Sequence, residues 1–147
     1  MPNLMATTRC NRRCEYCFAD EKMESSAEAL SSPTLTFERL NRYLDFLTQS
    51  NHKQLHLIGG EPTLHPAFPE IVHHAVRKGF SIKLFTNALM NERCLSALLQ
   101  LPPGAIHLLV NVNEKSSHRG AQWSLLNKNL SQLKSRAALG INVWQPR

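Results

Sequence analysis

The sequence predicts an α/β fold, in which about five parallel strands alternate with helices packed on the outside of the sheet. Strand-like apolar runs alternate with segments whose apolar residues recur at helical spacing. This alternation continues through the whole length, which favours a parallel sheet with right-handed crossovers. The 147 residues have 42% hydrophobic content, enough to bury one core, so we expect residues 1–147 to form a single domain.

Five strands are expected from their apolar content and from the turns that bound them. In chain order they are Leu4–Thr8, Lys53–Ile58, Phe80–Phe85, Ala105–Val112 and Ile141–Trp144. The Ala105–Val112 run is almost continuously apolar, which is typical of a parallel strand covered on both faces. We expect the polar residues that follow the strands to gather at one edge of the sheet, where α/β proteins place their active sites.

Four helices are expected between the strands. They are Phe37–Leu47 with Thr36 as N-cap, a segment from Pro66 to a stop at Gly79, Asn91–Leu101, and Gln122–Ala138 with Gly140 as its stop. The apolar side of the third helix includes Cys94, which we interpret as a small buried hydrophobic residue rather than a metal ligand. The polar stretch Asp20–Ser32 has no clear periodicity and indicates either a long surface loop or a frayed helix.

The charge of the chain does not by itself indicate a partner. The formal charge of +6 comes from 17 Lys and Arg residues against 11 acidic residues, scattered without a long basic run. Solvated helix faces account for this pattern better than a nucleic-acid surface does. The sequence shows neither a signal-peptide pattern nor an apolar run near the roughly 20 residues of a membrane span. We therefore expect a soluble protein in the reducing cytoplasm.

Three of the four cysteines, Cys10, Cys14 and Cys17, lie close together near the N-terminus. Thiolates at this spacing suit one metal centre better than a disulfide framework. Zinc sites usually need a fourth Cys or His and typically show two separated ligand pairs, and no such pair is formed by the remaining candidates Cys94, His52 and His56. Ferredoxins with two clusters use a different spacing, C-x2-C-x2-C. Because a [4Fe–4S] cluster is normally held by four thiolates, three cysteines predict a cluster with one iron open to a ligand that is not protein.

The C-x3-C-x2-C spacing, with Tyr16 before the last cysteine, resembles the cluster loop of the radical S-adenosylmethionine (SAM) enzymes. The segment Gly59-Gly60-Glu61-Pro62 follows the second expected strand, where these enzymes carry Gly-Gly-Glu-Pro. Two glycines and a proline would also suffice for an ordinary strand-to-helix turn, so the two motifs carry the resemblance together. The resemblance implies a partial (β/α) barrel of six strands, of which this chain would be the N-terminal part of the core with five.

The resemblance also implies roles for individual residues. Cys10, Cys14 and Cys17 would bind three irons of a [4Fe–4S] cluster, and SAM would chelate the fourth iron through its amino and carboxylate groups. The other residues implied to contact SAM or shield the cluster are Tyr16, Phe18, Gly59, Gly60, Glu61, Pro62, Thr86, Asn87, Asn111 and Asn113. For Thr86 and Asn87 a loop-capping role is equally compatible with the sequence, and the two asparagines Asn111 and Asn113 could form a solvated strand end. The chain departs from the family at Ala88, where Thr-Asn-Gly is common, and Gly140-Ile141 matches the family's adenine region only loosely.

The activity implied by the resemblance is reductive cleavage of SAM. One electron from reduced flavodoxin or ferredoxin would yield methionine and a 5′-deoxyadenosyl radical, which abstracts hydrogen from a substrate. Arg9, Arg12 and Arg13 would favour the thiolate forms of the cysteines, unless they are only surface charge. The same core serves peptide modification, activation of another enzyme by glycyl-radical formation, and small-molecule or RNA chemistry, so the resemblance leaves the substrate open. Among these, the Tyr-Cys-Phe-Ala continuation of the motif favours a peptide or protein substrate. The alternative is a non-catalytic iron–sulfur or zinc-binding module, because the sixth strand and a C-terminal extension are missing; the chain is expected to be either a fragment or a core that needs a partner.

Overall fold

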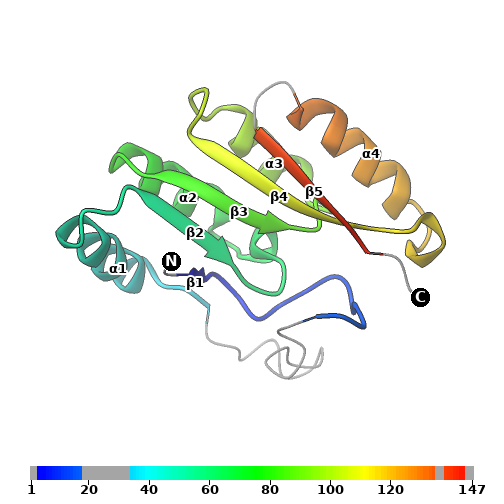
Figure 1. Cartoon of the computed structure of the whole chain (residues 1–147), viewed down its shortest axis with the longest axis horizontal. Helices are drawn as coiled ribbons and strands as arrows, with labels where there is room; N and C mark the ends of the chain where they lie inside the picture. Colours follow the sequence, from blue (N-terminus) through cyan, green and yellow to red (C-terminus); the bar gives the residue numbers. More distant parts are fainter. Residues whose placement is uncertain (1–2, 18–33, 135–137, 145–147) are drawn as a thin grey trace.

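A computed structural model describes residues 3–17, 34–134 and 138–144, so the predictions for Phe18 and for Asp20–Ser32 lie outside the described residues. Within the described residues, five strands form one parallel sheet in the order β1-β2-β3-β4-β5 (Figure 1). The strands are β1 Asn3–Met5, β2 Gln54–Ile58, β3 Ser81–Thr86, β4 Ile106–Asn113 and β5 Ala138–Trp144. The predicted α/β fold with about five parallel strands is confirmed.

The strand connections carry the α-helices α1 Phe37–Gln49, α2 Phe68–Arg77, α3 Glu92–Leu99 and α4 Gln122–Leu133. Thr36 caps α1 as predicted, because its hydroxyl accepts a hydrogen bond from the Arg39 N–H at 3.2 Å. The turn after α2 contains Gly79 with a φ of +84°, a left-handed conformation that glycine adopts freely. Among the described residues, no helix is both long enough and apolar enough to cross a membrane.

The hydrophobic core lies between the helices and one face of the sheet; α2 and α3 lie behind the sheet in the view of Figure 1. The buried side chains from the central strands include Leu55, Leu57, Ile82, Leu84 and Leu108. Along β4, buried positions alternate with the exposed His107 and the half-buried Leu109. The prediction that this strand is covered on both faces is therefore wrong for the described residues. The helices of a partial barrel cover only its outer face, and the inner face of this sheet is partly open.

The boundary between α4 and β5 also differs from the prediction. The helix ends at Leu133, and Ala138 and Gly140 both belong to β5. β5 pairs with β4 along its whole length, from His107 opposite Ala138 to Asn113 opposite Trp144. The helix formers of this segment favour continuation of α4, but a full ladder of strand hydrogen bonds overrides so weak a preference.

Candidate functional site

The loop that carries the three cysteines starts at the end of β1 and crosses the carboxyl ends of the neighbouring strands. Close to β2, the Gly60 N–H donates to the Thr7 carbonyl oxygen at 2.9 Å, and the Glu61 N–H donates to the Arg9 carbonyl oxygen at 2.7 Å. Further along, the side chain of Asn11 reaches the segment after β3, and the side chain of Tyr16 reaches β4. The structure therefore brings the cysteine loop and the Gly-Gly-Glu-Pro segment together, at the edge of the sheet where they were expected.

The two glycines make this approach of the two backbone segments possible. A Cβ atom on Gly59 would lie 2.5 Å from the Thr7 carbonyl oxygen, and one on Gly60 would lie 2.2 Å from the Arg9 carbonyl oxygen. The sequence suggested that the glycines allow a ligand to come close. In the structure they allow the chain itself to come close, since the segment they contact leads directly into Cys10.

Glu61 is fully buried and its carboxylate binds four groups of the protein. Oε1 accepts hydrogen bonds from the Thr63 N–H at 3.1 Å and from the hydroxyls of Thr63 and Thr86 at 2.7 Å each. Oε2 accepts from the Asn87 N–H at 2.7 Å. Burial raises the pKa of Glu61, and these hydrogen bonds act against that rise. The carboxylate thus joins the turn after β2, which continues into the 3₁₀ turn Pro62–Leu64, to the end of β3.

Asn87 connects the end of β3 to the cysteine loop. Its Nδ2 donates to Oδ1 of Asn11 at 2.7 Å, and Nδ2 of Asn11 donates to the Leu89 carbonyl oxygen at 3.0 Å. Oδ1 of Asn87 accepts from the Leu89 N–H at 2.9 Å, while the Thr86 hydroxyl accepts from the Ala88 N–H at 3.0 Å. Of the two side chains that were candidates for SAM contact, Asn87 therefore also holds the cysteine loop, and Thr86 holds the turn after β3 and the Glu61 carboxylate. Ala88 has a φ of +58° and is fully buried, so this position adopts the conformation for which the family often uses glycine.

Asn113, at the end of β4, contacts the cysteine loop directly. Its Oδ1 accepts a hydrogen bond from the Tyr16 hydroxyl, and its Nδ2 donates to the Cys14 sulfur at 3.6 Å. Burial, followed by the neighbouring Cys14, raises the pKa of Tyr16 to about 12, so the phenol remains a hydrogen-bond donor. Asn111 lies two residues earlier on the same face of β4 and is half-buried. The polar end of this strand is thus packed against the loop.

The three cysteines of the loop are free and only partly buried. Burial raises the pKa of Cys10 to about 11, although the Arg12 N–H, 3.4 Å from its sulfur, acts in the opposite direction. Arg12 thus favours the Cys10 thiolate through its backbone N–H, as predicted for this arginine, but burial outweighs that effect. The guanidinium of Arg12 instead donates to the carbonyl oxygen and the hydroxyl of Ser117, at 3.3 Å and 2.9 Å.

Three free thiols on one loop are the soft donor set that iron–sulfur clusters take. Within residues 3–17, 34–134 and 138–144, no three His, Cys, Asp or Glu side chains converge as a single-ion site would require. One nitrogen of Arg12, Nη1, is buried in the described structure without a hydrogen-bond partner. An unpartnered guanidinium nitrogen of this kind fits an anionic cofactor beside the loop. The residues present are therefore compatible with a cluster and with an anionic ligand on it.

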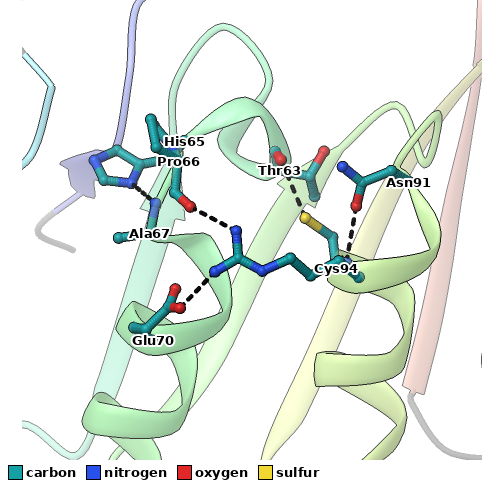
Figure 2. A network of polar contacts seen from close by, with 8 residues as sticks. Thr63, His65, Pro66, Ala67, Glu70, Asn91 and Cys94 are labelled. Atoms are coloured by element: carbon teal, nitrogen blue, oxygen red, sulfur yellow. Dashed lines mark hydrogen bonds and ion pairs between the residues drawn. The ribbon is translucent and has the colours of Figure 1, made fainter.

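Cys94 has a structural environment, as predicted. Its side chain is 3% exposed, and its sulfur donates to the Thr63 carbonyl oxygen at 3.3 Å (Figure 2). Arg93 holds the same region from outside, because it donates to the Pro66 carbonyl oxygen at 3.1 Å and to Glu70 at 2.5 Å. These contacts fasten α3 to the turn that follows Gly-Gly-Glu-Pro.

The sequence interpretation missed two asparagine side chains that organise the site, and it gave Arg12 a different role. Asn11 lies inside the cysteine motif, where the spacing drew attention to the cysteines, and Arg12 was expected to favour the thiolates, whereas its guanidinium binds Ser117. Asn129 of α4 is 1% exposed, and its Nδ2 donates to the carbonyl oxygens of Ala88 and Met90 at 2.8 Å and 3.0 Å. A signal for Asn129 was present, since helical spacing places it on the same side as Leu126 and Leu133.

Comparison with known proteins identifies the family to which the chain belongs. The sequence matches the family model of the Radical SAM superfamily over residues 4–117. It is 27% identical over 112 residues to the tungsten-containing aldehyde ferredoxin oxidoreductase cofactor-modifying protein of Pyrococcus furiosus, covering 74% of this chain and 30% of that protein. It is 32% identical over 90 residues to the PqqA peptide cyclase of Rhodopseudomonas palustris, covering 61% of this chain and 22% of that protein. The chain thus spans less than a third of the length of these relatives.

The fold is similar to that of a solved structure. The crystal structure of Streptococcus suis SuiB bound to precursor peptide SuiA matches 97% of this chain and 32% of that chain, with a TM-score of 0.69 and 15% sequence identity. At this identity the likeness establishes the fold, and it agrees with a partial barrel. The cofactors of the family are a [4Fe–4S] cluster and SAM. From its cysteine motif, its fold and its match over residues 4–117, the chain belongs to the radical SAM superfamily.

Proposed function

We propose that residues 1–147 form part of one radical SAM core domain, and that Cys10, Cys14 and Cys17 hold a [4Fe–4S] cluster in an enzyme that acts on a peptide or protein. One observation carries the proposal: all three cysteines lie on a loop that is fastened across the carboxyl ends of β2, β3 and β4. The peptide substrate is supported by the similarity to a peptide cyclase and by a fold shared with an enzyme solved with its precursor peptide.

The residues around the cysteines would bind and orient the cofactors. Asn113 would donate to the Cys14 sulfur and keep Tyr16 in place. Arg12 would offer its unpartnered Nη1 to an anionic group. Because the carboxylate of Glu61 is fully buried among its own partners, the segment Gly59–Pro62 would contact SAM through its backbone groups.

The remaining assignments complete this proposal. Further residues proposed to lie beside SAM are Phe18, Thr86, Asn87 and Asn111. With one electron from reduced flavodoxin or ferredoxin, the cluster and SAM would supply a 5′-deoxyadenosyl radical that abstracts hydrogen from the substrate. The four free thiols of the chain are consistent with the reducing cytoplasm as its setting.

The test is anaerobic reconstitution with iron and sulfide, followed by electron paramagnetic resonance of the reduced protein with and without SAM. We expect a reduced-cluster signal that changes when SAM is added and that is lost in Cys14→Ala. Cys94→Ala is the matched control, because it removes a thiol outside the loop; it should keep the cluster signal and its response to SAM.

Three outcomes would contradict the proposal. If a cluster assembles but SAM leaves its spectrum unchanged, the chain behaves as an iron–sulfur module without SAM chemistry. If the purified chain holds zinc and takes up no iron, the site is a zinc site. An equal loss of signal in Cys14→Ala and Cys94→Ala would show that the loop is not the specific ligand set.

A further inference from the structure

A groove lies between β1 and α1, on the side of the sheet away from β4. It encloses about 660 Å³ and is lined by Leu4, Met5, Thr8, Leu35, Arg39, Arg42, Tyr43 and Phe46. This volume lies within the range of pockets that bind ligands in proteins. None of the residues that line the groove belongs to the cysteine site described above, and none of them carries a negative charge.

The groove is elongated, because it follows two elements lengthwise. On one wall it extends from Leu4 to Thr8 along β1 and its continuation, roughly 13 Å of extended chain at about 3.3 Å per residue. On the other wall it extends from Arg39 to Phe46 along α1, roughly 10 Å at about 1.5 Å per residue. β1 is the end strand of the described sheet, so its other edge faces no neighbouring strand there. A groove of this shape fits an extended segment of about four residues.

Two hydroxyl groups in the groove are buried and lack a hydrogen-bond partner in the described structure. They are Oγ1 of Thr8 and the phenol oxygen of Tyr43. Buried polar groups are nearly always paired in proteins, and each exception calls for an explanation. Burial raises the pKa of Tyr43, so its hydroxyl remains a donor. A peptide backbone offers the carbonyl oxygens that such donors need.

Two cations and several apolar side chains complete the lining. Arg39 and Arg42 are exposed on α1, and among the described residues neither takes part in an ion pair. Guanidinium groups bind carboxylates through paired hydrogen bonds. Phe46 is 55% exposed and its ring lies 6.5 Å from that of Tyr43, which leaves an aromatic surface open to solvent next to the arginines. The lining of the groove thus offers guanidinium groups for carboxylates, hydroxyl groups for backbone carbonyl oxygens, and apolar side chains for apolar contact.

From these observations we propose that the groove between β1 and α1 binds an extended peptide segment that carries acidic and apolar side chains. Its carboxylates contact Arg39 and Arg42, its backbone carbonyl groups accept from Thr8 and Tyr43, and its apolar side chains pack on Leu35 and Phe46. One end of the groove, at Thr8, is two residues from Cys10, so a peptide held here runs towards the cysteine loop. The identification of this peptide as the substrate rests on the function proposed above. The binding of the peptide by the groove does not depend on that function.

Fluorescence anisotropy of the chain without cluster or SAM tests the proposal. The probe is a fluorescein-labelled peptide of alternating leucine and glutamate, compared with a peptide in which lysine replaces each glutamate. We expect binding of the glutamate peptide only, and an affinity about tenfold lower in the double variant Arg39→Gln/Arg42→Gln. The double variant Lys53→Gln/Arg77→Gln is the matched control; it removes two exposed cations outside the groove and should bind within about twofold of the parent chain.

The variant Tyr43→Phe distinguishes binding from a structural role. Removing an unpartnered buried hydroxyl should leave the melting temperature unchanged or raised, while the affinity for the glutamate peptide falls. A role in folding alone would lower the melting temperature and leave the affinity unchanged.

Three results would overturn the proposal: equal affinity in the two double variants, unchanged affinity in Tyr43→Phe, or displacement of the peptide by a short oligothymidine at lower concentration than by unlabelled peptide. Because cluster and SAM are absent from this measurement, its failure leaves the cluster experiment standing. A failure to assemble a cluster likewise leaves the groove measurement standing.

Discussion

His65 has one ring nitrogen committed as donor and the other as acceptor. Its Nε2 lies 2.9 Å from the Leu35 carbonyl oxygen and must carry the proton, while Nδ1 accepts from the Ala67 N–H at 3.0 Å (Figure 2). A second proton, on Nδ1, would face the Ala67 donor. Burial also lowers the pKa of His65 from its usual value of 6.5. The folded chain therefore favours the neutral imidazole.

This preference predicts a pH dependence of stability. As the pH falls below about 6.5, the unfolded chain binds a proton at His65 while the folded chain does not, so the free energy of unfolding decreases. We expect His65→Gln, which cannot titrate, to lose less stability than the parent chain between pH 7.5 and pH 5.5. Urea unfolding at the two pH values measures this, and an equal loss in both proteins would show that His65 is not the group responsible.

Ala88 illustrates how far a single position can be predicted. The resemblance to a family with Thr-Asn-Gly marked this position as unusual. Only the structure shows why: φ is +58°, and the methyl group is fully buried. A backbone angle depends on the elements that enclose the loop, and these were not visible in the local sequence.

At the scale of elements, α4 supports the site although none of its residues is near the cysteine motif in sequence. Asn129 binds the carbonyl oxygens of Ala88 and Met90, and the loop that contains them binds Asn11 of the cysteine loop. The position of α4 therefore affects the cysteines through two successive contacts. Its inward face was predictable from helical spacing, but its end was not, because pairing of β5 with β4 decides where the helix stops.

Asn129→Leu should disturb both stability and cluster loading. The substitution leaves two buried carbonyl groups without a donor, which costs roughly 1–3 kcal/mol in free energy of unfolding. Urea unfolding and the iron content after reconstitution measure the two effects, and both should decrease. Asn127→Leu is the control on the same helix, since Asn127 is exposed and, within the described part of the chain, its side chain binds only the Trp123 carbonyl oxygen of its own helix; we expect a change within about 0.5 kcal/mol. Normal iron content in Asn129→Leu would disprove the connection between α4 and the cysteine loop.

At the scale of the whole molecule, the site depends on one crossing of two backbone segments. The strands and most helix boundaries followed from local patterns of apolar residues, caps and glycines. The crossing did not, because it joins residues far apart in sequence, such as Gly60 with Thr7 and Asn113 with Cys14. The sequence could indicate which motifs belong together, but not which side chains fasten them.

Gly60→Ala should therefore be far more damaging than an alanine at another glycine. Its Cβ would lie 2.2 Å from the Arg9 carbonyl oxygen, so the two segments must separate, at a cost of about 3 kcal/mol. At Gly79 a Cβ would have open space around it and only the positive φ to oppose it, at about 1 kcal/mol. Urea unfolding and iron content should both fall in Gly60→Ala, whereas Gly79→Ala should keep its iron. If Gly60→Ala had the same free energy of unfolding as the parent chain, the close approach of the two backbone segments at Gly60 would be contradicted.

The order of the sheet also has a consequence for synthesis. Each strand pairs with the one made just before it, so the sheet can grow from β1 towards β5 as the chain leaves the ribosome. The hydroxyl of Tyr16, however, binds Asn113, which lies 97 residues further along the chain and is therefore synthesised later. At translation rates of about 5–20 residues per second, the cysteine loop spends roughly 5–20 s without the strand that fastens it. Insertion of iron into a finished site is therefore a late event, which follows the emergence of β4.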